Sequence, residues 1–206
     1  FLNYLVLLGW TPPPGPEKRS LDQIINEFDI RDVHKSGAIF DPKKLEWLNR
    51  EYMLLIPDGQ YLNEMLSHAH SWNKDMAAKL VPLVKERISV WHEFETTKDD
   101  FDYFFSEPKL DPAKIPGKGS DAEIARNHLM HLRKLFATLP SSEEVTAEEV
   151  KGLIWDYAEA EGRGNVLWPL RYALTGREKS PDPFLVAAII GKEVLSRRID
   201  VALKAL

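Results

Sequence analysis

The 206-residue sequence contains no cysteine, so the chain has neither a disulfide nor a thiolate that acts as a nucleophile or metal ligand. Its first ten residues are apolar, but they are too few to span a bilayer and lack the basic flank and cleavage site of a signal peptide. Strand-like alternation and internal repeats are also missing. We therefore expect an all-α protein of the cytoplasm that does not associate with a membrane.

An overall excess of positive charge is missing too. The chain has 27 Lys and Arg against 32 Asp and Glu, a net charge of −5, which argues against a strongly basic nucleic-acid binder. Residues 163–206 nevertheless carry eight Lys and Arg against four Asp and Glu, or +4, whereas residues 1–162 carry −9. A local charge bias of this kind most often marks a solvated surface. Only a sequence motif can therefore indicate that residues 163–206 bind RNA.

Helix signals are frequent along the chain. Ser20 with Gln23 and Thr146 with Glu149 have capping-box spacing, Asp41 precedes Pro42 at a helix start, and Asp58 is a candidate cap for the next helix. The acidic runs at 143–144 and 148–149 suit the first turn of a helix. These signals predict helices nearly throughout.

Prolines and glycines predict where the helices break. Pro82 is expected to divide or kink the apolar-periodic run from Lys74 to Phe94. Gly162, Gly176 and Gly191 are expected to end helices. The stretch 109–120, with two prolines and two glycines and no apolar period, predicts a linker.

Two clusters leave alternatives open. His128 and His131 are three residues apart and can share a helix face, which raises the alternative of a metal-dependent hydrolase. No HExxH spacing and no cysteine supports such a site, so we expect no metal. The aromatic residues at 101 and 103–105 either stack on bases or form a buried patch, and we favour the buried patch.

The most informative stretch is Asn165–Gly176, NVLWPLRYALTG, in which a proline-containing helix carries Arg171 and then reaches a glycine. Two further segments belong with it: LNYLVLLGWTP at the start and AIFDPKKLEWLN at 38–49. Together with SPDPF at 180–184 and IGKE at 190–193, these segments resemble, in the same order, segments of bacterial-type glutamyl-tRNA synthetases. PLRYALTG resembles their C-terminal anticodon-binding region. The resemblance covers the chain nearly end to end.

The resemblance implies an all-α tRNA-binding fragment of a glutamate–tRNA ligase. It implies a helical remnant of the stem-contact region at 1–57 and two anticodon-binding subdomains at 58–113 and 114–206. The HIGH-like and KMSKS-like motifs of the family's nucleotide-binding domain are missing from this sequence, and the chain starts at Phe1 rather than Met. We therefore expect a fragment without catalytic residues or cofactors, although the parent enzyme uses ATP and Mg²⁺. The implied partner is glutamate tRNA, bound through its anticodon loop and stem by a monomer.

The resemblance also implies which residues contact tRNA. Arg171 matches the family arginine that lies against the first anticodon base, and Ser180, Pro181 and Pro183 match the loop beside it. Arg87 aligns with the arginine near the third anticodon base, where it is associated with accepting C and rejecting G.

Lys44 and Asn49 lie in the segment that resembles the stem-contact region, where Lys44 is expected to meet a phosphate. Trp47 is interpreted as a core residue. An alternative to RNA binding is a helical protein-interaction module that has kept the scaffold and lost RNA, and the negative net charge is its best support.

Overall fold

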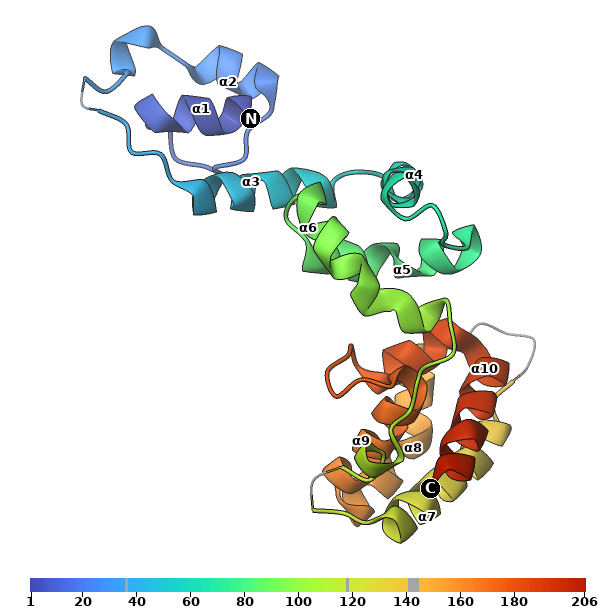
Figure 1. Cartoon of the computed structure of the whole chain (residues 1–206). Coiled ribbons are helices and arrows are strands. Elements are labelled where there is room, and N and C mark those ends of the chain that lie inside the picture. The colour runs from blue at the N-terminus through green and yellow to red at the C-terminus, as the bar shows by residue number, and fades with distance from the viewer. Residues whose placement is uncertain (36, 118, 141–144) are drawn as a thin grey trace. The chain divides into compact units, whose positions relative to one another are not determined.

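The computed structural model describes residues 1–35, 37–117, 119–140 and 145–206, and within these ranges the chain forms helices and no strand (Figure 1). The expected all-α fold is confirmed. No helix in the described ranges is long and apolar enough to cross a membrane. In chain order the α-helices are α1 (Leu2–Gly9), α2 (Leu21–Glu27), α3 (Pro42–Leu54), α4 (Asp58–His68), α5 (Lys74–Arg87), α6 (Trp91–Thr97), α7 (Ala122–Ala137), α8 (Ala147–Glu161), α9 (Arg163–Thr175) and α10 (Pro183–Ala205), with 3₁₀ turns η1 (Ile30–Asp32), η2 (Lys98–Phe104) and η3 (Pro112–Lys114).

The chain divides into two compact units, residues 1–98 and residues 99–206. The predicted linker 109–120 is therefore not the boundary between them. Its central part packs into the second unit, where Ile115 is fully buried and the Asp111 amide donates to the Tyr172 hydroxyl at 3.4 Å. The three-part functional division, with boundaries at 57 and 113, stays a prediction.

The predicted helix caps are largely as expected. Ser20 and Thr146 each accept a hydrogen bond from the amide three residues on, and the partner side chains Gln23 and Glu149 complete both capping boxes. Asp41 caps α3 as well. The prediction for Asp58 is wrong, because Asp58 is the first residue of α4 and its carboxylate pairs with the ammonium of Lys85 at 2.7 Å.

Proline does not break the helix where the sequence suggests. Helix α5 continues through Pro82 to Arg87, and the chain leaves the helix at 88–90, so the expected division at Pro82 is wrong. An interior proline costs roughly 3 kcal/mol. Here α5 buries Ala77, Leu80, Val81 and Val84 in the core of the first unit, and that burial offsets the cost.

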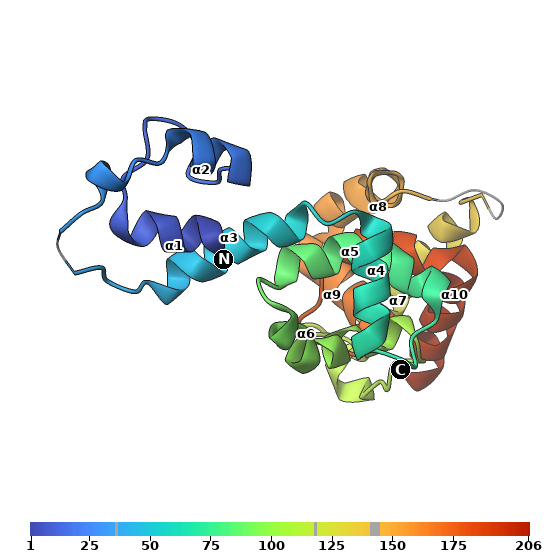
Figure 2. The ribbon, with the colours of Figure 1, turned by 90° about the horizontal axis from the view of Figure 1, so that it is seen from above.

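Helices α7 to α10 form the core of the second unit, with α10 packed against the other three (Figure 1). Figure 2 shows the same ribbon turned by 90°. Its fully buried side chains include Leu129, Leu132, Phe136, Ile154, Leu170 and Leu195. Gly162, at φ 92°, separates α8 from α9, and Gly191, at φ 78°, makes a kink within α10 where a helix end was expected. Glu148 and Glu149 lie in the first turn of α8, as predicted, whereas positions 143–144 fall outside the described residues.

Candidate nucleic-acid interface

Arg171 lies in the last two turns of α9, just ahead of the turn that leads into α10. Pro169 fits within this helix, and Gly176 ends it at φ 66°, with its amide donating to the Tyr172 carbonyl at 2.7 Å. A Cβ atom on Gly176 would lie 2.7 Å from the Lys109 carbonyl oxygen. The conformation and the close approach both require glycine here.

The loop between α9 and α10 brings the predicted residues of this motif together. Arg171 is half-buried, and its Nη1 donates to the Ser180 carbonyl at 3.4 Å. The Ser180 hydroxyl donates to the Pro181 carbonyl at 2.9 Å, and Asp182 caps α10 by accepting from the Phe184 amide at 2.8 Å. Arg171, Ser180 and Pro181 therefore form one junction between helix and loop.

Pro183 lies in helix α10, whereas Ser180 and Pro181 lie in the loop before it. It is the first residue of α10 and its side chain is buried, so it offers little surface to a nucleotide. Its fixed φ suits the first position of a helix. Pro183 thus sets the direction of the loop that presents Ser180 and Pro181.

Arg87 is exposed in the last turn of α5, in the first unit. Two side chains of α3 donate to backbone carbonyls at this helix end, Arg50 to Glu86 at 2.8 Å and Asn49 to Ser89 at 2.5 Å, and Lys85 of α5 donates to the Ile56 carbonyl after α3 at 2.7 Å. The last carbonyls of a helix lack partners within the helix, so side chains from α3 complete its end. The structure thus places Asn49 beside the backbone that carries Arg87.

The remaining predicted residues of the first unit lie on α3. The Lys44 ammonium lies 3.2 Å from a Glu17 carboxylate oxygen, in a pair that is partly open to solvent. Trp47 is 42% exposed, so its interpretation as a core residue is wrong. Leu48, which follows it, takes the buried position instead and is 2% exposed.

The aromatic patch and the histidines have structural partners. Phe101, Tyr103 and Phe104 are 1–5% exposed and Phe105 is half-buried, which confirms the buried patch. His128 is 6% exposed, its Nδ1 lies 2.8 Å from the Tyr157 hydroxyl, and burial lowers its pKa. His131 stacks on the same tyrosine with ring centroids 3.9 Å apart. Among the described residues no three His, Cys, Asp or Glu side chains form a group able to hold a metal ion.

Arg198 is a residue that the sequence analysis overlooked. It is 3% exposed and donates to the carbonyls of Leu174, Tyr103 and Ser106. Burial lowers its pKa, and its position three residues after Leu195 places it on the apolar face of α10. That spacing was the available signal, but an arginine in an apolar stripe does not by itself reveal its partners.

Comparisons with known proteins identify the family of the chain. Residues 59–203 match the family described as anticodon binding domain. The whole chain is 30% identical to part of the glutamate–tRNA ligase of Flavobacterium johnsoniae and 32% identical to part of that of Clostridium kluyveri, covering 40% and 42% of those proteins. A crystal structure of a glutamate tRNA ligase from Elizabethkingia meningosepticum is similar over 98% of this chain and 40% of its own, with 31% identity and a TM-score of 0.77.

The chain thus spans about 40% of the length of these relatives. The resemblance to glutamyl-tRNA synthetases that the sequence segments indicated is confirmed. The comparisons give no support to the alternative of a protein-interaction module without RNA binding. The chain belongs to the anticodon binding domain family, in the form that glutamate–tRNA ligases carry.

Proposed function

We propose that this chain is the anticodon-binding part of a glutamate–tRNA ligase, the enzyme that uses ATP to attach glutamate to its tRNA. It recognises the anticodon loop and stem of glutamate tRNA as a monomer in the cytoplasm. ATP and Mg²⁺ belong to the catalytic part of the parent enzyme, and this chain alone activates no glutamate.

The junction of Arg171 with the α9–α10 loop carries the proposal. A guanidinium has five donors in a planar fork, and it can stack on a base as well as donate to it. Bases in a splayed single-stranded loop expose their pairing edges to such a side chain. Arg171 reaches Ser180 with only one long hydrogen bond of 3.4 Å, so most of its donors have no partner among the described residues. It is our candidate for contact with the first anticodon base, beside Ser180 and Pro181.

Arg87 is our candidate for the third anticodon base. Cytosine presents the acceptors O2 and N3 on its pairing edge, which match arginine donors, whereas guanine presents donors at N1 and N2. An arginine at this position therefore favours a final C over a final G. The end of α5 is fixed by bonds from Arg50 and Asn49, which supports a defined position for the Arg87 backbone.

Lys44 and Asn49 complete the proposal on the stem side. Lys44 is paired with Glu17 in a partly exposed ion pair, which contributes little and exchanges readily for a phosphate. Asn49 is exposed but donates to the Ser89 carbonyl, so in this proposal it meets RNA through its second amide hydrogen.

A titration tests this function. The chain is titrated with a hairpin that carries the glutamate anticodon stem and loop, at several salt concentrations between about 50 and 200 mM. Phosphate contacts predict that the logarithm of the binding constant falls linearly with the logarithm of salt, by about 0.7–0.9 per contact. Absence of binding at the lowest salt, with the chain shown to be folded, would refute the proposal.

A further inference from the structure

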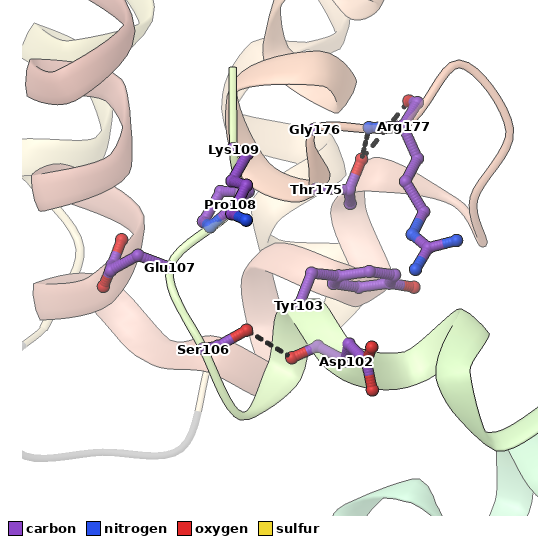
Figure 3. Close-up of a pocket in the computed structure, with 9 residues that line it drawn as sticks. All are labelled: Asp102, Tyr103, Ser106, Glu107, Pro108, Lys109, Thr175, Gly176 and Arg177. Carbon is purple, nitrogen blue, oxygen red and sulfur yellow. Dashed lines mark hydrogen bonds between the residues drawn. The ribbon is translucent and has the colours of Figure 1, made fainter.

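A cleft of about 480 Å³ opens in the second unit, outside the residues already assigned to RNA. One wall is the end of η2 and the segment after it, with Tyr103, Pro108 and Lys109. The other is the end of α9 and the turn after it, with Thr175 and Arg177 (Figure 3). Figure 3 shows Arg177 extending from the turn toward Tyr103, with Pro108 and Lys109 across the cleft. This volume falls within the range of small-ligand pockets, roughly 300–1,000 Å³, and one nucleotide fits it.

The two walls are tied together by a buried cation. Arg198, on α10, donates to the carbonyls of Tyr103 and Ser106 on one wall and of Leu174 at the end of the other. Because its side chain is only 3% exposed, breaking these bonds would leave a buried charge without partners. The separation of the walls is therefore fixed before any ligand arrives.

Further contacts fix the turn that closes the cleft. Gly176 packs against the backbone of Lys109, and the Arg177 Nη2 atom donates to the Asp99 carbonyl at 2.7 Å. The Thr175 hydroxyl donates to the Arg171 carbonyl at 2.8 Å and accepts from the Arg177 amide at 3.1 Å. The cleft thus lies one helical turn from Arg171, on the same rigid support. A pocket that is ordered in advance loses little entropy on binding.

The charges around the cleft suit a nucleotide, which has an anionic phosphate and a base with polar groups. Lys109 is exposed, and among the described residues its ammonium has no partner, so it remains available to a phosphate. Two nearby carboxylates already face arginines, because Glu107 pairs with Arg197 and Asp100 lies 3.5 Å from Arg177. The exposed carboxylate of Asp102 remains as an acceptor for the N–H groups of a base.

We propose that this cleft binds one unstacked nucleotide of single-stranded RNA, next to the nucleotide that Arg171 contacts. Its phosphate lies at Lys109 and Arg177, and its base lies against Pro108, which is half-buried. Single-strand binding uses cationic side chains that follow the phosphate backbone, and Lys109 and Arg177 supply one such side chain on each wall of the cleft. The inference rests on the proposed function, because it assumes that the anticodon loop docks on this unit.

Two variants of the whole chain test the cleft. Lys109→Ala removes the available ammonium, and Ser106→Trp fills the cleft from an exposed position without changing charge. Their controls are Lys134→Ala, at another exposed lysine of the same unit, and Thr138→Trp, at another exposed hydroxyl that donates to a backbone carbonyl of its own helix end. The probe is the glutamate anticodon hairpin, with 2-aminopurine placed at one loop position at a time.

We expect Lys109→Ala to weaken binding about fivefold or more and to flatten the salt slope by about 0.7, the value for one single-strand phosphate. Ser106→Trp is expected to weaken binding about tenfold, the order of the loss of one bound base, because the indole fills the space of the base, and to abolish the fluorescence change at one loop position only. Both controls are expected to stay within about twofold of the original chain, as surface changes away from a site do.

The outcomes separate this inference from the function on which it rests. If the original chain binds the hairpin and Arg171→Ala weakens it, but Lys109→Ala and Ser106→Trp match their controls, the cleft is not a nucleotide site and the proposed function stands. If the original chain does not bind the hairpin, the proposed function fails and this inference falls with it. If Ser106→Trp does not fold, Lys109→Ala decides alone, because its side chain is exposed.

Discussion

Replacing Arg198 by methionine should destabilise the second unit strongly, although arginine is usually a surface residue. The Arg198 guanidinium is buried and donates to three carbonyls, two of them at 2.5 Å and one at 3.0 Å. Hydrogen bonds to a charged group contribute about 1.5–3 kcal/mol each. They are not additive, and methionine removes the cost of burying the charge, so we expect a net loss of about 3–5 kcal/mol.

Arg197 is a matched control in the adjacent position. Its side chain is 57% exposed and pairs with Glu107, which is 52% exposed. Exposed pairs contribute about 0–1 kcal/mol, so Arg197→Met should cost less than about 1 kcal/mol. The two variants delete the same charge from the same helix and differ only in burial and in the partners of the side chain.

Native-state hydrogen exchange resolves the effect within the second unit, without assuming that both units unfold together. A loss of 3 kcal/mol corresponds to roughly 150-fold faster exchange of the most protected amides in α9 and α10. Arg197→Met should accelerate the same amides less than about fivefold. Equal acceleration by the two variants would refute the argument that Arg198 ties the walls of the cleft.

Three further predictions concern recognition and pH. Arg171→Ala should weaken binding to the glutamate anticodon hairpin by about 1–3 kcal/mol and change the free energy of unfolding by less than about 1 kcal/mol, because its structural bond is long; a collapse of stability with normal residual binding would make Arg171 structural. Arg87→Gln should narrow the difference in binding free energy between a hairpin whose anticodon ends in C and one whose anticodon ends in G by about 1 kcal/mol, because the Gln amide can donate to C and accept from G. Equal losses of binding to both hairpins would show that Arg87 contacts phosphates or stabilises the fold. Lys98 and then His68 lower the pKa of Glu95 to about 2 from 4.5, so its stabilising contribution is fully present above pH 4.5 and is lost as the pH falls through about 2. Glu95→Gln should therefore flatten the acid-side fall in stability of the first unit, and an unchanged pH profile in urea unfolding would contradict this.

Much of the local structure follows from short-range signals. The two capping boxes and the glycine that ends α9 depend on residues within four positions of one another, so the sequence alone was sufficient. The junction of Arg171 with Ser180 also spans only nine positions. Arg171 and Ser180 come close to each other once α9, the turn after it and the start of α10 have formed.

Features that depend on distant packing were not predictable. Helix α5 persists through Pro82 because one of its faces is buried in the core, and no local rule gives the strength of that packing. Asn49 and Arg50 complete the end of α5 from about 40 positions away. The cleft joins segments about 70 positions apart through Arg198, which the apolar spacing of α10 alone does not pair with any carbonyl.

The central claim is that this chain distinguishes anticodons, and a pair of dissociation constants tests it most directly. The chain is titrated at one salt concentration with the glutamate anticodon hairpin and with the same hairpin carrying a scrambled anticodon. Because both hairpins have the same number of phosphates, electrostatic attraction cancels in the ratio. We predict that the glutamate anticodon binds at least about tenfold more tightly, the effect of one good base contact. Equal dissociation constants would show that the chain binds only the phosphate backbone and would contradict anticodon recognition.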